Sequence, residues 1–166
     1  MRSRFVGPCF LLVIALAFFR HLAHPDSVLY LRDLSLEVLP FRRHIAEMMA
    51  QGTPPWWSPL VFGGAPTVPM VHGLFYPPSA VFFVLPLPWA LKVFIVGHTL
   101  VAGMGVWLLL RALAVPPVAA LLGASTYMLS GYMVSAGNLV NLLVGAAWFP
   151  WALGCFARAT DAGRPR

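Results

Sequence analysis

Two carboxylates stand four residues apart in this sequence of 166 residues, at Asp33 and Glu37. Side chains at that spacing share one face of a helix, and a pair of carboxylates there can hold a divalent cation or divide the roles of general acid and base. An aspartate near a helix start also commonly caps the helix. Asp33 is therefore the candidate catalytic residue and Glu37 a weaker one, with capping as the alternative. The sequence leaves the need for a metal open.

Several further side chains are candidates for binding a substrate. Arg42 and Arg43 follow on the same predicted helix, and a guanidinium group suits a phosphate because its planar fork matches the phosphate oxygens. His98 lies inside an apolar run, where an ionisable side chain is a functional candidate. A neutral hydrogen bond between helices explains His98 equally. The other weak candidates are His72, Tyr76 and Asn141.

The residues from Arg32 to Gln51 have the period of an amphipathic helix. Apolar side chains recur there at steps of three and four residues: Leu34, Val38, Phe41, Ile45 and Met48. The pattern predicts a helix lying on the outer membrane face. Pro40 should kink this helix or begin a second helical piece, because it lacks an amide hydrogen, and Gly52 should end it.

The stretch after Gly52 is rich in proline and glycine and predicts an irregular backbone. Its paired residues Trp56 and Trp57 suit the headgroup level of a bilayer, where the ring and the N–H can both be satisfied. The apolar piece from Ser79 to Leu85 is too short to span a membrane. We expect it to form a helix in, or dipping into, the outer leaflet.

The composition excludes an ordinary soluble domain. Hydrophobic residues make up 60% of the chain, charged residues make up 10%, and the mean hydropathy is +0.80, whereas soluble domains are roughly 45–50% apolar and about 25% charged. Cys9 and Cys155 each lie inside an apolar run, which argues against a disulfide or a cysteine metal site. The bilayer is therefore the predicted surrounding.

Four apolar runs are long enough to cross a hydrocarbon core of about 30 Å. They cover residues of about 5–23, 89–113, 118–136 and 139–157, and leave 24–88 as a long loop. The first run also fits a signal peptide, but Phe18, Phe19 and Leu22 continue beyond the best cleavage site, which favours an uncleaved span. The predicted fold class is all-α, a polytopic membrane protein with about four transmembrane helices and an external loop carrying amphipathic helices.

The arginines set the predicted orientation. Six arginines lie at the ends of the apolar runs. With the N-terminus in the cytoplasm, all six are on the cytoplasmic side: Arg2, Arg4, Arg111, Arg158, Arg164 and Arg166. The positive-inside rule therefore places the N-terminus in the cytoplasm and the long loop outside. This placement accounts for the net charge of +6, so we expect no nucleic-acid partner.

An ordered series of residues runs through the loop and the later spans: Asp33, Pro40, Arg42, Gly52, Pro55-Trp56, Pro59, Phe62-Gly63-Gly64-Ala65-Pro66, Phe75-Tyr76-Pro77, His98, Gly103, Arg111, Leu129-Ser130-Gly131 and Pro150-Trp151. The series resembles the N-terminal part of the YfhO-like bacterial membrane proteins, relatives of the GT-C glycosyltransferases. The resemblance implies an inverting enzyme of the bacterial cell (inner) membrane. Its donor would be a polyprenyl-phosphate sugar used on the external face. The family's hallmark acidic residue in the first external loop corresponds to Asp33.

The chain departs from this family in length, because such relatives have many more spans. We interpret residues 1–158 as an N-terminal GT-C-like module and residues 159–166 as a polar tail at a truncation point. A fragment of this kind would have an incomplete donor groove. The alternative function is a non-catalytic membrane assembly or transport component that keeps the fold without the chemistry. The sugar and the acceptor, glycan or protein, are left open.

Overall fold

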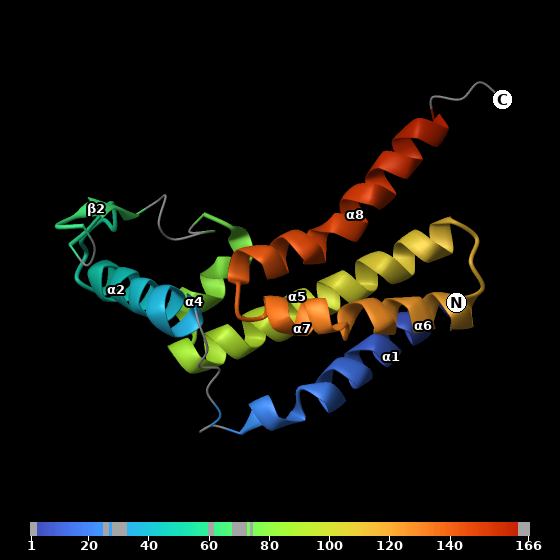
Figure 1. The fold of residues 1–166 in the computed structure, drawn as a ribbon, viewed down its shortest axis with the longest axis horizontal. Coiled ribbons are helices and arrows are strands. Elements are labelled where there is room, and N and C mark those ends of the chain that lie inside the picture. Colours follow the sequence, from blue (N-terminus) through green and yellow to red (C-terminus); the bar gives the residue numbers. More distant parts are fainter. Residues whose placement is uncertain are drawn as a thin grey trace. The chain divides into compact units, whose positions relative to one another are not determined.

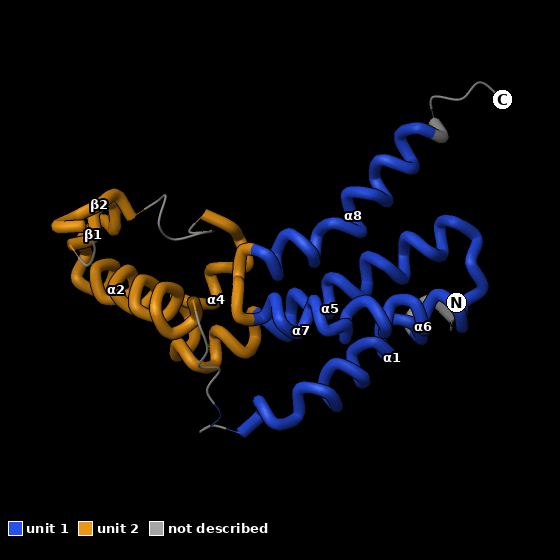
Figure 2. Tube along the Cα trace, viewed as in Figure 1, with its two compact units in different colours: residues 1–27, 95–137, 142–166 blue, residues 28–94, 138–141 orange. Residues whose placement is uncertain are grey.

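The structure is a computed structural model of the chain. It describes residues 3–24, 27, 33–59, 62–67, 73 and 75–162. Most of these residues are helical, as the predicted all-α class requires. The chain divides into two compact units (Figure 2): unit 1 comprises residues 1–27, 95–137 and 142–166, and unit 2 comprises residues 28–94 and 138–141.

Unit 1 is a set of apolar helices (Figure 1). Its elements are α1 (Ser3–Phe18), η1 (Arg20–Ala23), α5 (Leu87–Ala112) from Ile95 onward, α6 (Pro117–Met128), α7 (Gly131–Ala136) and α8 (Val140–Ala162) from Leu142 onward. Among the described residues, three helical stretches are long and apolar enough to cross a membrane: Leu87–Ala112, Pro117–Ala136 and Val140–Thr160. Three of the four predicted spans therefore have a matching helix.

The first predicted span, residues 5–23, forms a shorter helix than expected. Helix α1 has 16 residues and ends at Phe18, and the 3₁₀ turn η1 follows it. An α-helix of that length reaches about 24 Å, less than the roughly 30 Å of a hydrocarbon core. The polar pair Arg20 and His21 lies in the turn, where the apolar pattern gives way. The count of four spanning helices is not confirmed.

The third predicted span is interrupted near its middle. Helix α6 ends at Met128, and Ser130 takes an extended conformation with ψ 152°. The Ser130 hydroxyl then accepts a hydrogen bond from the Met133 N–H at 3.3 Å, which caps α7. Serine is a preferred N-cap because its oxygen satisfies a helix-start N–H.

Small residues let the helices of unit 1 approach closely. Helix α1 packs against α6, where Leu11 and Ala15 meet Ala124 and Met128 in a buried cluster. A Cβ on Gly105 of α5 would come within 2.7 Å of the Trp151 ring on α8. Close approach through small side chains is how helices associate in lipid.

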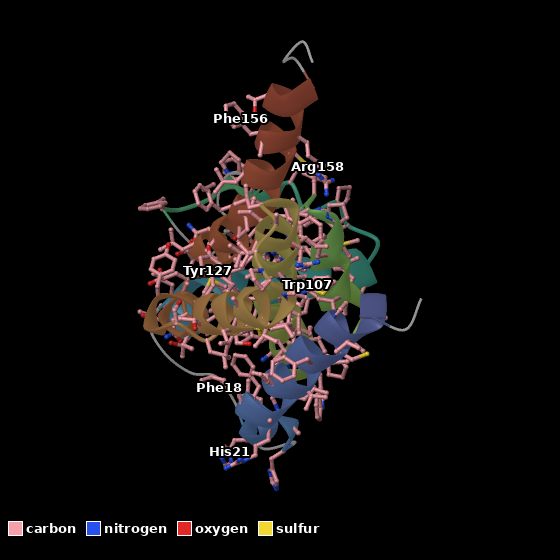
Figure 3. All side chains as sticks on the ribbon, turned by 90° about the vertical axis from the view of Figure 1, so that its right-hand side faces the viewer. Phe18, His21, Trp107, Tyr127, Phe156 and Arg158 are labelled. Atoms are coloured by element: carbon pink, nitrogen blue, oxygen red, sulfur yellow. The ribbon has the colours of Figure 1, made fainter. Side chains whose placement is uncertain are left out.

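Pro150 lies inside α8, which changes direction about halfway along (Figure 1). A proline cannot donate to the carbonyl four residues earlier, here that of Ala146. The Tyr127 hydroxyl donates to that carbonyl at 3.0 Å instead, and Figure 3 shows Tyr127 among the helices of unit 1. A side chain of α6 thus satisfies the backbone group that the proline leaves open.

The hydrogen bond from Tyr127 predicts that the effect on stability of replacing Tyr127 depends on whether residue 150 is proline. Tyr127→Phe should destabilise the protein by about 1–2 kcal/mol, because it leaves a buried carbonyl without its donor. In a Pro150→Ala background the helix supplies its own N–H, so the same change should cost less than about 0.5 kcal/mol. Unfolding of the four proteins in mixed micelles measures this cycle. Equal costs in both backgrounds would contradict it.

Unit 2 contains the elements of the long loop and the start of α5. They are η2 (Leu34–Val38), α2 (Leu39–Ala50), β1 (Trp57–Ser58), β2 (Ala65–Pro66), η3 (Pro77–Ala80) and α4 (Val81–Val84). The two strands pair antiparallel, with Trp57 opposite Pro66 and Ser58 opposite Ala65. This hairpin lies within a stretch for which the sequence predicts only irregular backbone.

The amphipathic helix predicted from Arg32 to Gln51 is confirmed as a helical run from Asp33 onward, and its position on the outer membrane face stays a prediction. Leu34, Phe41 and Ile45 are buried within the protein, and α2 contacts α4. Protein therefore covers at least these three positions of the apolar face, while Val38 and Met48 are half-buried. Periodicity shows that a helix has an apolar face but not what covers it.

The short apolar piece from Ser79 to Leu85 is confirmed as a separate helix. It forms the end of η3 and all of α4, and Leu85 then turns to an extended conformation with ψ 152°. Pro86 follows, and α5 begins only at Leu87. A proline disfavours helical backbone at the residue before it, which explains the break. The position of this piece in the outer leaflet stays a prediction.

Candidate functional site

The acidic pair lies on an unusual helical segment. Asp33 has helical angles, φ −61° and ψ −25°, and η2 begins directly after it as a π-helix carrying Glu37. The Leu39 N–H donates to the Leu34 carbonyl, a bond across five residues, just before Pro40 in the first turn of α2. The boundary predicted at Pro40 is therefore present, as a change from the π-helix η2 to the α-helix α2. Short π-helical turns occur frequently at functional sites.

The structure bears on the capping alternative for Asp33. A capping aspartate accepts a hydrogen bond from a backbone N–H of the first helical turn. In the described part of the chain, the Asp33 side chain makes no such bond at the start of η2. Both carboxylate residues are half-buried. The capping explanation therefore lacks the contact that defines it, and the chemical role of Asp33 stays a prediction.

The two neighbouring arginines of α2 have different surroundings. Arg43 is exposed and its Nε donates to Glu47 at 2.8 Å. Arg42 is only 3% exposed, and its Nη2 donates to the Ser79 hydroxyl at 3.2 Å. The Arg42 guanidinium also lies 4.6 Å from the centre of the Phe82 ring. Arg42 therefore joins α2 to η3 and α4, while Arg43 faces outward.

Burial changes the electrostatics of Arg42. Loss of contact with water lowers the pKa of its guanidinium to about 10, because a low dielectric disfavours the charged form. The side chain still carries its proton at neutral pH. A hydrogen bond and a ring face then replace part of the hydration that the charge has lost.

The Phe82 ring that contacts this buried cation belongs to a series of packed aromatic side chains. Phe82 and Phe94 have ring centroids 5.3 Å apart, and Tyr76 packs edge-on to Phe94 at 6.2 Å. The Ser79 N–H donates to the Tyr76 carbonyl at 2.7 Å, which ties the start of η3 together. Arg42 and Tyr76, two predicted binding residues, thus belong to one packed cluster in unit 2.

Three further predicted binding residues are His72, His98 and Asn141. His72 lies outside the described residues. His98 is buried on α5 in unit 1. Asn141 is exposed in the first turn of α8. The described binding candidates are therefore divided between the two units, with His98 in unit 1 and Arg42, Arg43, Tyr76 and Asn141 in unit 2.

Sequence reasoning did not single out Lys92 of α5 as a candidate. It is buried, and its Nζ lies 4.5 Å from the centre of the Trp89 ring, one turn earlier. Arg42 and Lys92 are thus both buried cations in the described part of unit 2. The sequence does contain a feature that could have pointed to Lys92. It follows Trp89 by three residues at the start of an apolar run, and this spacing places both side chains on one face of a helix.

No cluster of three or more histidine, cysteine, aspartate or glutamate side chains suited to a metal occurs in the described ranges. A divalent cation held by Asp33 and Glu37 would need further oxygen ligands from a substrate or from water.

In comparisons with known proteins, no family model, no curated protein and no solved structure matches this chain. The resemblance to YfhO-like proteins accordingly stays a prediction.

Proposed function

We propose that this chain is a membrane glycosyltransferase-like protein of the GT-C type, or the N-terminal part of one. The observation that carries the proposal is the pair Asp33 and Glu37 on a π-helical start that leads directly into α2. The apolar helices that can span a membrane, and the ordered residues shared with the YfhO-like pattern, support it.

The proposed reaction is one displacement at the anomeric carbon of a polyprenyl-phosphate sugar. The Asp33 carboxylate takes the proton of an acceptor hydroxyl as its oxygen forms the new bond to that carbon. The bond between the carbon and the phosphate oxygen breaks at the same time, and polyprenyl phosphate leaves with the electron pair. Attack opposite the leaving group inverts the anomeric configuration.

The arginines of α2 divide two roles in this scheme. Arg43 is exposed and can exchange its contact with Glu47 for a donor phosphate, since a solvent-exposed ion pair is held by only about 0.2–1 kcal/mol. Arg42 is buried against Ser79 and Phe82 and fixes the helix that carries the acidic pair. We therefore assign phosphate contact to Arg43 and positioning to Arg42.

Binding of polyprenyl phosphate tests the donor class without knowledge of the acceptor. The purified protein in detergent should retain polyprenyl phosphate in native mass spectrometry, and polyprenol without phosphate should bind more weakly by about tenfold or more. Arg43→Ala should reduce this preference for the phosphate, because the guanidinium is the proposed phosphate contact. Equal retention of both lipids by the unaltered protein would contradict a phosphate-linked donor.

The proposed orientation has its own test. A Thr53→Cys protein lacking Cys9 and Cys155 should react with an impermeant maleimide in intact cells, because Thr53 is exposed and lies on the predicted external side. Ser58 is less suited to labelling, because it is fully buried. The matched variant is Arg158→Cys near the end of α8. The Arg158 side chain is exposed there and projects to the opposite side of the helix from Phe156 (Figure 3). It should react only after permeabilisation, and the reverse pattern would overturn the orientation.

A further inference from the structure

Four large aromatic side chains of unit 2 remain exposed around the β1–β2 hairpin. Trp56 is 57% exposed, Trp57 is 56%, Phe62 is 91% and Phe75 is 70%. Trp56 and Phe75 have ring centroids 6.4 Å apart, which brings the later segment beside the hairpin. We call these four side chains the aromatic patch. Unit 2 buries Leu34, Phe41 and Ile45 but leaves this patch outside.

The hairpin backbone holds Phe62 outward. Phe62 has φ +54°, and Gly63 and Gly64 follow with φ +72° and +124°. A residue with a Cβ rarely adopts positive φ, because the side chain crowds the backbone. The turn is nevertheless fixed at its base, where the Thr67 N–H donates to the Trp56 carbonyl at 2.9 Å. A strained position thus presents a phenyl ring almost entirely outside the protein.

Glycine at position 64 makes room for a second aromatic ring. A Cβ there would lie 2.7 Å from the Trp57 indole, too close for any side chain. The missing Cβ lets the indole lie against the backbone of the turn while the rest of the ring stays exposed. Two positions of one short hairpin are therefore shaped to display aromatic rings.

The charge pattern identifies what such a surface contacts. No aspartate, glutamate, lysine or arginine occurs between Glu47 and Lys92. An uncharged patch of tryptophan and phenylalanine costs about 25 cal/mol per Å² in water. Tryptophan is enriched at the boundary between lipid headgroups and acyl chains, and phenylalanine and tryptophan both occur on the apolar face of helices that lie in this boundary. This chain also carries helices that can span a bilayer.

We infer that the aromatic patch inserts into the headgroup and acyl boundary of a lipid bilayer, with Phe62 at its tip. A soluble glycan is a weaker fit, because Phe62, the most exposed of the four, offers no hydrogen bond to a sugar hydroxyl. Lipid contact by this patch does not depend on the sugar-transfer proposal. It would give unit 2 its own membrane anchor.

The test uses the complete chain in phosphatidylcholine liposomes, with Cys9 and Cys155 replaced by serine. A nitrobenzoxadiazole dye attached to Phe62→Cys should emit at shorter wavelength and be quenched by lipids carrying a shallow doxyl group. Iodide in the water should quench it at least threefold less than the same dye on Glu47→Cys, an exposed site on α2. Phe75→Cys should behave like Phe62→Cys.

Equal iodide quenching at positions 62, 75 and 47, with no effect of doxyl lipids, would overturn the inference. A second contrary result is that iodide quenches the dye at position 62 and a soluble oligosaccharide protects the dye from iodide. That result would overturn the inference and would assign the patch to sugar binding. The folded state of each labelled protein is checked by gel filtration. Phe62 is almost fully exposed, so its replacement removes little packing.

Discussion

Replacing Asp33 by asparagine should lower sugar transfer by about 10²–10⁴-fold while the amount of folded protein stays near normal. Asparagine keeps the size of the side chain and caps a helix about as well as aspartate, but it cannot act as a base at neutral pH. The Asp33 side chain makes no capping hydrogen bond among the described residues. The substitution therefore removes the proposed chemistry with little change in stability.

The measurement for Asp33→Asn is sugar transfer in membranes from cells that carry the full-length protein, normalised to its abundance. Glu47→Gln is the matched control, because Glu47 is exposed on α2 and forms its ion pair with Arg43, one turn away on the same surface. It should change transfer by less than about twofold, as expected for a surface charge. Transfer by Asp33→Asn within about threefold of the unaltered protein would remove Asp33 from the mechanism. Glu37→Gln would then be the next variant.

Arg42→Ala should destabilise the protein by about 2–4 kcal/mol. The substitution removes a charge-assisted hydrogen bond, worth about 1.5–3 kcal/mol, and leaves the buried Ser79 hydroxyl without that donor. It also removes the contact with the Phe82 ring, for which desolvated pairs contribute up to about 2 kcal/mol. Relief of the cost of burying the charge offsets part of this loss.

The neighbouring arginine supplies the control for this stability prediction. Arg43→Ala should cost less than about 0.5 kcal/mol, because Arg43 forms an exposed pair with Glu47 one turn away. Arg42→Lys should fall between the two, since lysine keeps the charge but loses the planar fork. Unfolding in mixed micelles measures all three. Equal costs for Arg42→Ala and Arg43→Ala would contradict the structural role of Arg42.

The helical part of the external loop could be predicted from periodicity. The recurring apolar positions of α2 and η2 fall on the buried face, as at Leu34, Phe41 and Ile45. What covers that face could not be predicted, because lipid and protein both accept an apolar stripe. Pro40 marked a boundary correctly, but the change to a π-helix depends on the packing of the whole segment.

The spans were predictable where apolar runs are long, and less so where they are short or broken. Leu87–Ala112 matches its predicted run closely. The break at Ser130 was not predicted, because serine and glycine are common within membrane helices and a cap shows only in three dimensions. The different surroundings of Arg42 and Arg43 also lay beyond the sequence. Adjacent residues of a helix point about 100° apart, and which one is buried depends on α4 and η3.

The most direct test of the proposed function is consumption of the donor on the external face. Sealed right-side-out vesicles bearing the full-length protein would receive radiolabelled polyprenyl-phosphate hexoses in the outer leaflet. The expected result is release of polyprenyl phosphate in proportion to the amount of protein, with the label retained in a glycosylated product. The Asp33→Asn protein should neither release polyprenyl phosphate nor form the labelled product. Donor consumption that does not rise with the protein for any hexose tested would contradict a lipid-linked sugar transferase and favour a non-catalytic membrane component.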